Sequence, residues 1–197
     1  MRKKFMLVIT LGLAILFIFT SLYCYRERVD RIYELTFLSN FFAGLFLLGT
    51  AAALIFERKV PNILYLDVTM LLALVLFVCT AFHDVFDFKG MFLFLHMLNP
   101  SFMAIYYFIF CDMNESAESS SVLSIFFMPG AYLVFAAVFG KVTGNYIYFF
   151  LNAESHGYMY CMMFVFLLTV IFLMLGYALF YVNRILFRIR KNKPHHV

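Results

Sequence analysis

Three polar side chains open one hydrophobic run of the sequence, and their types could do chemistry: Thr36, Ser39 and Asn40. They lie in Leu-Thr-Phe-Leu-Ser-Asn, residues 35–40. In a helix, residues i, i+3 and i+4 lie on one face, so the three side chains project from the same side. An unpaired polar group is costly away from water, so this polar face needs a partner.

A histidine and an asparagine interrupt a second apolar run and are the partners we expect. His96 and Asn99 share a helix face because they are three residues apart. Pro100 lacks a backbone N–H and tends to kink a helix, so we expect the carbonyl of His96 to be free for another bond. Two interpretations of His96 stay equally open. It is either a packed side chain or a functional group, which is the default for an ionisable residue in a membrane.

A hydroxyl beside an imidazole, with amides nearby, is the arrangement that acyl transfer needs. Thr36 would be the nucleophile, and His96 the general base and then the general acid. Asn40 and Asn99 are candidates to stabilise the oxyanion or to orient the pair. Just beneath a membrane surface, such a site would meet ester carbonyls at head-group depth. Lipid-like esters are therefore the predicted substrates.

A third polar stretch, residues 141–152, is rich in tyrosine and amide side chains. Tyrosines of this kind commonly form a belt at the membrane interface, and they would equally roof a cavity. Asn145, Tyr146 and Tyr148, together with Ser39, are therefore our candidates for the entrance and for substrate binding.

The composition indicates the elements that must position these residues. Of the 197 residues, 65% are hydrophobic and 13% are charged, which is far outside the usual range for a soluble domain. A helix needs about 20 apolar residues to cross a bilayer. Six such runs predict an all-α, polytopic membrane protein, a six-helix bundle in a single domain of residues 1–197. The predicted helices are about 5–23, 35–56, 63–82, 91–110, 122–140 and 158–182.

The distribution of Lys and Arg predicts that both chain ends lie in the cytoplasm. With that orientation, ten of the 15 basic residues lie on the inner side and five on the outer side, as the positive-inside rule favours. The second and fourth helices then both begin at the outer face. Thr36 lies about 3 Å and His96 about 8 Å below that face at 1.5 Å per residue, so they share a depth. Residues 141–152 lie on the same side.

Other features of the composition exclude several classes of function. The net charge of +4 fits contact with anionic lipid head groups better than with nucleic acid, since no soluble domain could carry a binding face. The four cysteines form no CxxC or Cys/His cluster, so we expect no metal. No Gly-rich phosphate loop is present, so we expect no cofactor. The predicted partners are membrane lipids and a lipid ester, and the sequence leaves the oligomeric state open.

Three segments of the chain carry a family resemblance. They are Tyr-Glu-Leu-Thr-Phe-Leu-Ser-Asn at 33–40, His-Met-Leu-Asn-Pro at 96–100 and Val-Thr-Gly-Asn-Tyr-Ile-Tyr-Phe-Phe-Leu at 142–151. In this order, over nearly the whole chain, they resemble the androgen-induced family of multi-pass membrane threonine hydrolases and their bacterial relatives. The resemblance implies hydrolysis of fatty acid esters of hydroxy fatty acids in a bacterial cell membrane. It also implies Thr36 as the nucleophile and His96 as its partner.

Two other classes of function compete with a hydrolase. A non-catalytic membrane scaffold or sensor would use Thr36 as a helix-start residue and His96 as a packed one. A small transporter or channel would need a polar path across the bilayer, yet the inner half offers little beyond Asp67 and Thr69. For Asp67 we expect an ion pair or a helix-end contact, with Arg58 or Lys59 of the preceding loop as the candidate partners, in preference to a proton relay.

Overall fold

The computed structural model describes residues 2–83, 88–113 and 118–192, and this part of the chain is helical and contains no strand. The predicted all-α fold is confirmed. The α-helices are α1 (Arg2–Tyr25), α2 (Leu35–Ile55), α3 (Asn62–Ala81), α4 (Asn99–Phe110), α5 (Phe127–Thr143), α6 (Ala153–His156) and α7 (Tyr158–Lys191). The shorter segments are the 3-10 turns η1 (Val29–Arg31), η3 (Ser119–Phe126) and η4 (Phe149–Leu151) and the π-helical segment η2 (Phe94–Leu98).

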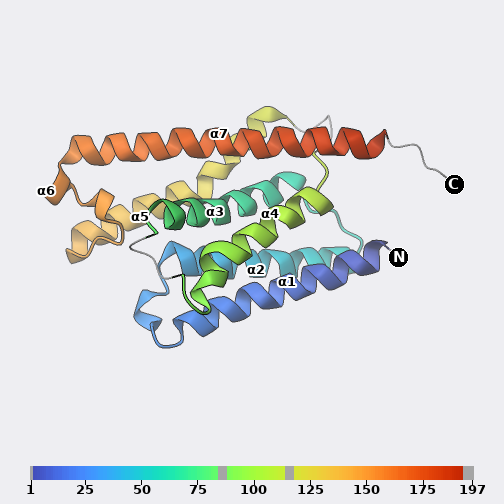
Figure 1. The fold of residues 1–197 in the computed structure, drawn as a ribbon, viewed down its shortest axis with the longest axis horizontal. Helices are drawn as coiled ribbons and strands as arrows, with labels where there is room; N and C mark the ends of the chain where they lie inside the picture. Colours follow the sequence, from blue (N-terminus) through green and yellow to red (C-terminus); the bar gives the residue numbers. More distant parts are fainter. Residues whose placement is uncertain (1, 84–87, 114–117, 193–197) are drawn as a thin grey trace.

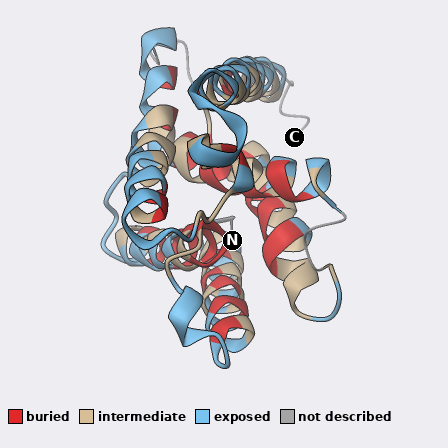
Figure 2. Ribbon diagram, turned by 90° about the vertical axis from the view of Figure 1, so that its left-hand side faces the viewer, coloured by how far each residue is buried: buried red, intermediate tan, exposed pale blue. Residues whose placement is uncertain are grey.

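Five helices of the described chain are long and apolar enough to cross a membrane, which supports the predicted multi-pass fold. They cover Lys3–Tyr25, Leu35–Ile55, Asn62–Ala81, Ser119–Thr143 and Tyr158–Lys191. The remaining predicted helix, 91–110, is observed as the shorter apolar segment Phe94–Phe110. Large apolar side chains such as Phe5, Phe127 and Phe166 are exposed, as contact with lipid allows. Figure 2 shows the buried residues gathered on helix faces that turn toward the middle of the bundle.

The segments that carry the candidate residues gather at one end of the bundle. Figure 1 shows that α1 begins and α7 ends at the same end, which we name the inner end after the predicted topology. At the opposite, outer end lie the α1–α2 connection, the start of the α4 arm with η2, and the segment between α5 and α7 (Figure 1). Which side of the membrane each end faces stays a prediction.

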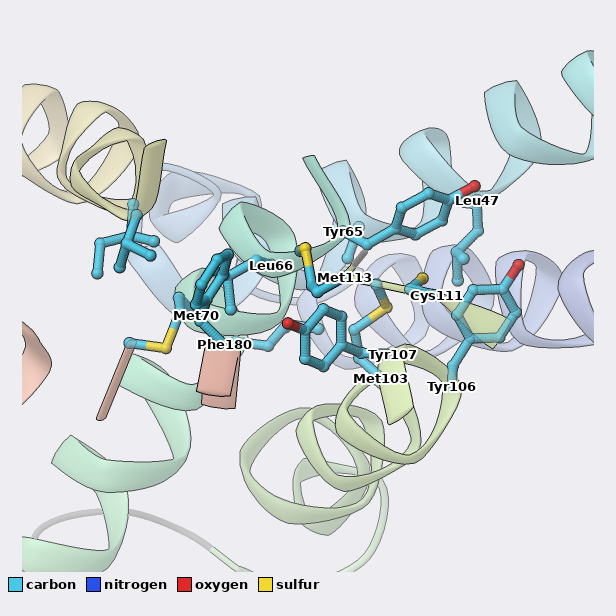
Figure 3. Close-up of a cluster of buried hydrophobic side chains, with 14 of the residues drawn as sticks. Leu47, Tyr65, Leu66, Met70, Met103, Tyr106, Tyr107, Cys111, Met113 and Phe180 are labelled. Atoms are coloured by element: carbon cyan, nitrogen blue, oxygen red, sulfur yellow. The ribbon is translucent and has the colours of Figure 1, made fainter. Parts of the chain in front are cut away.

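The largest buried cluster includes the middle of the bundle and joins α1, α2, α3, α4, η3 and α7. Figure 3 shows the methionine side chains of this core among aromatic rings, including Met70, Met103, Tyr65, Tyr107 and Phe180. Nearby, α1 and α2 approach each other closely at Gly44. A Cβ built there would lie 2.6 Å from Cγ1 of Ile18, so only a glycine fits without displacing that side chain.

The inner end is held by the last turns of α7, which ends at Lys191 and not near the predicted residue 182. The guanidinium of Arg190 donates to the carbonyl oxygens of Phe108 (2.7 Å) and Ile109 (3.2 Å) at the end of α4, and it pairs with Asp112 at 2.9 Å. These bonds satisfy carbonyls that a helix end leaves without an internal partner. The predicted end was wrong because hydropathy marks only the stretch that meets hydrocarbon, whereas this helix continues through contacts beyond it.

Candidate active site

Thr36 lies at the outer end, in the first turn of α2. The helix begins at Leu35, whose N–H donates to the hydroxyl of Tyr132 on α5 at 2.9 Å. The first regular helical hydrogen bond runs from the N–H of Leu38 to the carbonyl oxygen of Glu34, over 3.0 Å. The N–H groups of Thr36 and Phe37 make no hydrogen bond within the described residues, as is usual for the first turn of a helix.

The Thr36 hydroxyl differs from those of most other threonines in the bundle. Six helical threonines each donate to the carbonyl oxygen four residues earlier: Thr10, Thr20, Thr69, Thr80, Thr143 and Thr169. The corresponding residue for Thr36 is Ile32, which precedes the helix, and its hydroxyl makes no hydrogen bond to a described residue. Thr36 is 7% exposed. Its side chain is therefore buried, while its hydroxyl is not hydrogen-bonded to any described residue.

His96 lies in η2, directly before α4, and is 4% exposed. Its imidazole packs between two phenylalanine rings, with centroid distances of 5.5 Å to Phe88 and 5.8 Å to Phe92. The guanidinium of Arg28 lies over the Phe92 ring, 5.1 Å from its centroid. The histidine is therefore packed against aromatic rings.

Thr36 and the histidine lie between the same two apolar clusters. Leu35, the residue before Thr36, belongs to a cluster against which Phe88 packs. Phe37, the residue after it, belongs to a second cluster against which Phe92 packs. The structure thus brings the two predicted catalytic residues to one region between α2 and η2. No hydrogen bond joins the Thr36 hydroxyl to the imidazole in the described structure.

Asn40 and Asn99 form a buried amide network directly beneath this region. The amide nitrogen of Asn40 donates to the carbonyl oxygens of Thr36 (2.8 Å) and Leu95 (3.1 Å). The amide nitrogen of Asn99 donates to Oδ1 of Asn40 (2.9 Å) and to the hydroxyl of Thr20 on α1 (3.0 Å). The amide hydrogens of both asparagines are therefore engaged, which suits an orienting role more than donation to an oxyanion. Oδ1 of Asn99 is buried without a partner in the described structure.

The π-helical turn η2 explains why Asn40 reaches Leu95. The N–H of Asn99 donates to the carbonyl of Phe94, five residues earlier. In that register the carbonyl of Leu95 would receive the N–H of residue 100, which Pro100 lacks. Asn40 supplies the missing donor. The carbonyl that bonds to α2 is therefore that of Leu95, whereas we expected that of His96. The difference arises because a π-helix pairs residues five apart, one more than an α-helix.

The predicted entrance residues Asn145, Tyr146 and Tyr148 line one pocket at the outer end, which has a volume of about 460 Å³. The ring of Tyr146 packs on Gly140 of α5, where a Cβ would collide with it. Tyr148 stacks on the ring of Phe150 with a centroid distance of 5.2 Å. Burial raises the pKa of the Tyr148 hydroxyl well above its ordinary value, so this group stays protonated at neutral pH.

Ser39 lies apart from this entrance pocket. It is fully buried, and its hydroxyl donates to the carbonyl oxygen of Thr36 at 3.3 Å. Two residues of the region were missed in the sequence: Tyr132, which accepts the N–H of Leu35, and Thr20, which accepts from Asn99. A lone hydroxyl in an apolar run signals its role only when its partner across the bundle is known.

The middle of the bundle separates polar groups at the two ends. On α1, Ala14 and Phe17 are fully buried between Thr10 and Thr20, which are about 15 Å apart along the helix. On α2 and α4 the corresponding buried side chains are Ala43, Leu47 and Met103. We name these five residues the apolar band.

Asp67 lies in the inner half of α3 and accepts a hydrogen bond from the Ser124 hydroxyl at 2.6 Å. The expected partner, a basic residue of the preceding loop, was wrong: among the described residues the contact comes from η3. Within the described ranges, no group of three or more His, Cys, Asp or Glu side chains could hold a metal ion.

No protein-family model, curated protein or solved structure matches this chain. Its class therefore rests on its own fold and site: it is an all-α, multi-pass membrane protein. At its outer end it holds a threonine and a histidine over a buried amide network. What this site does is argued below from its chemistry.

Proposed function

We propose that this protein hydrolyses lipid esters at its outer end, with Thr36 as nucleophile and His96 as general base. One observation carries the proposal. Thr36 is a nearly buried threonine whose hydroxyl is not bonded within its helix, and it shares its surroundings with a buried histidine. A hydroxyl acts as a nucleophile when a base is within reach. Catalytic hydrogen bonds are often long in a ligand-free site and tighten when substrate binds.

The reaction has two steps, and His96 carries the proton in both of them. First, Oγ1 of Thr36 attacks the ester carbonyl carbon while His96 takes the hydroxyl proton. The bond from that carbon to the alcohol oxygen then breaks, and His96 returns the proton to the leaving alcohol. Second, water attacks the acyl-threonine ester, its proton passes through His96 back to Oγ1, and the fatty acid leaves.

The first turn of α2 supplies donors for the oxyanion of both steps. The N–H groups of Thr36 and Phe37 have no partner among the described residues, and they lie at the positive end of a 21-residue helix. Asn40 and Asn99 hold the turns that carry the two catalytic residues, because their amide hydrogens are engaged with Thr20, Leu95 and each other. They act as orienting residues.

The position of the site favours an ester with long apolar chains. A carbonyl at the level of the first turn of α2 is reached from the membrane interface, while the attached chains stay among apolar groups. Fatty acid esters of hydroxy fatty acids, which the family resemblance implies, have this form. The partners of the reaction are then lipid substrates drawn from the membrane.

The apolar band argues against the transporter alternative. A transport path needs polar groups across the whole bilayer. In the inner half, the hydroxyls of Thr10 and Tyr106 lie 2.8 Å from each other. Phe17 and Met103, both fully buried, separate this pair from the amide network at the outer end. The polar residues therefore form two separate groups.

Covalent labelling with a fluorophosphonate tests the nucleophile. We expect the purified wild type and Thr80→Ala to be labelled, and Thr36→Ala to be unlabelled. Thr80 is the matched control, because it is a helical threonine whose hydroxyl is bonded to the carbonyl of Leu76. We expect His96→Ala to label at least tenfold more slowly, because a general base contributes roughly 100-fold or more.

Labelling that persists in Thr36→Ala would exclude Thr36 as the nucleophile. Turnover of a fatty acid ester that survives in both Thr36→Ala and His96→Ala would exclude the mechanism. A wild type that is neither labelled nor active would favour the non-catalytic scaffold or sensor.

A further inference from the structure

A second cavity of the outer half lies between α3, α5 and α7 and has a volume of about 110 Å³. Its α5 wall is formed by Pro129, Gly130 and Leu133, and its α7 wall includes Leu168 and Thr169. None of the residues predicted from the sequence except Tyr148 lines it. We name this cavity the α5–α7 groove.

The walls of the α5–α7 groove are apolar along most of its length. Its one polar α7 residue, Thr169, donates its hydroxyl to the carbonyl of Val165 at 2.8 Å, which leaves no free donor there. The other hydroxyls belong to Tyr132 and Tyr148, whose rings lie 6.3 Å apart between centroids. The groove therefore has one polar end and one apolar end.

The polar end of the groove adjoins the proposed catalytic threonine. Leu35, the residue directly before Thr36, lines the groove, and its N–H donates to the Tyr132 hydroxyl that also lines it. The groove and the entrance pocket share Val78, Tyr148 and Phe150 in their linings, so the two spaces adjoin. The two linings together therefore extend from the 144–152 segment, past the start of α2, to the apolar walls of the groove.

We propose that the α5–α7 groove binds one acyl chain of the ester substrate, with the ester group at the start of α2. Between Val165 and Phe172 the α7 wall is about 10 Å long, which suits one extended hydrocarbon chain. The polar end matches the ester, the apolar walls match the chain, and the alcohol portion lies toward the entrance pocket. This inference rests on the proposed function for its chemistry and on the groove for its ligand.

Positioning, and not burial alone, is what the groove contributes. A hydrocarbon chain gains little by leaving lipid for an apolar protein surface, because both surroundings are apolar. A chain seated in the groove, however, fixes the attached carbonyl beside Thr36, and a displacement of about 1 Å from a reactive geometry costs roughly 100-fold in rate. The groove thus selects esters by acyl-chain length.

Gly130 offers a clean way to fill the groove. Gly130 lines the groove, and a Cβ built there meets no atom within 4 Å, so a side chain can begin at this position without a clash at its Cβ. Gly12 on α1 is the matched control, because its Cβ also meets nothing within 4 Å and it does not line the groove. Both substitutions replace a helical glycine, so they change helix propensity alike.

The first test compares turnover of palmitate and acetate esters of one alcohol in detergent micelles. We expect Gly130→Leu to lower the ratio of palmitate to acetate turnover by about tenfold or more, and Gly12→Leu to leave it unchanged. Thr169→Phe, which fills the groove from the opposite wall, gives the same shift. An unchanged ratio in both groove variants would overturn the assignment.

The second test measures binding without turnover, in the Thr36→Ala background. A palmitate analogue with a diazirine near the chain end should cross-link to residues 126–133 or 165–172, and Gly130→Leu should abolish that product. Cross-linking elsewhere, or cross-linking that survives Gly130→Leu, would place the chain outside the groove. If Thr36→Ala still hydrolyses esters while this cross-linking holds, the proposed catalytic function fails and the groove remains a lipid-chain site.

Discussion

Asn40 links the two halves of the candidate site, because one amide nitrogen bonds the carbonyl of Thr36 and that of Leu95. We predict that Asn40→Ala lowers the free energy of unfolding by about 1–2 kcal/mol, since the buried carbonyl of Leu95 loses its side-chain donor and the Asn99 amide nitrogen keeps only its bond to Thr20. Ester turnover should fall at least tenfold. Thermal unfolding and turnover of the same preparation measure both effects.

Asn62→Ala is the control for Asn40→Ala. The amide of Asn62 donates to the carbonyl of Asp112 at the inner end, so its loss also removes a bond between segments. It should cost stability and leave turnover unchanged. Wild-type turnover in Asn40→Ala would show that the amide network does not orient the catalytic residues.

Thr36→Val separates chemistry from packing at a single position. Valine has nearly the shape of threonine, and the Thr36 hydroxyl makes no hydrogen bond to a described residue, so the thermal midpoint should change little. Turnover should fall roughly a thousandfold or more, because the nucleophile is gone. Thr36→Ser should retain turnover. A Val variant as active as the wild type would mean that the hydroxyl takes no part in the reaction.

The π-helical turn η2 carries His96, the proposed general base, and Pro100 follows directly after this turn and Asn99. We predict that Pro100→Ala raises stability, by at most about 3 kcal/mol, because it restores a helical N–H. That N–H competes with Asn40 for the carbonyl of Leu95 and turns His96 out of its present direction, so turnover should fall. Parallel measurement of unfolding and turnover checks the opposite signs. Turnover that rises with stability would contradict this role for the turn.

Arg190 gives a second prediction at the level of elements. Its guanidinium meets two carbonyl oxygens at the end of α4 and the carboxylate of Asp112. We expect Arg190→Lys to lower the free energy of unfolding by about 1 kcal/mol, nearly as much as Arg190→Ala. The reason is that the single ammonium of lysine cannot contact both carbonyl oxygens and the carboxylate at once, as the planar guanidinium does. Thermal unfolding measures the loss. Full rescue by lysine would show that charge alone is required.

The positions of the helices could be predicted closely from the sequence, and their internal geometry could not. The start of α2 at Leu35 and the start of α7 at Tyr158 are as predicted, because an apolar run marks hydrocarbon contact directly. The π register of η2 depends on Asn40 from another helix, which no local pattern contains. Likewise, polar breaks in apolar runs predicted Thr36 and His96 as a pair, whereas Tyr132 and the α5–α7 groove arise only when three helices assemble.

At the scale of the whole molecule, the two ends of the bundle must face opposite sides of the membrane. We predict that, in a background without the four native cysteines, a cysteine at Asn145 reacts with an impermeant maleimide from outside the cell. A cysteine at Glu57, in the exposed α2–α3 turn, should react only from the cytoplasm. The reverse pattern would place the candidate site at the inner face.

The apolar band has a consequence for the cell that carries this protein. A living membrane stores energy as a voltage and a proton gradient, and any continuous file of hydroxyls or water across it would discharge both. Phe17, Leu47 and Met103 fill the space between the outer amide network and the inner Thr10–Tyr106 pair, and each is fully buried. If the proposed ester hydrolysis takes place at the outer end, water can therefore reach that end while the membrane around the bundle stays electrically insulating.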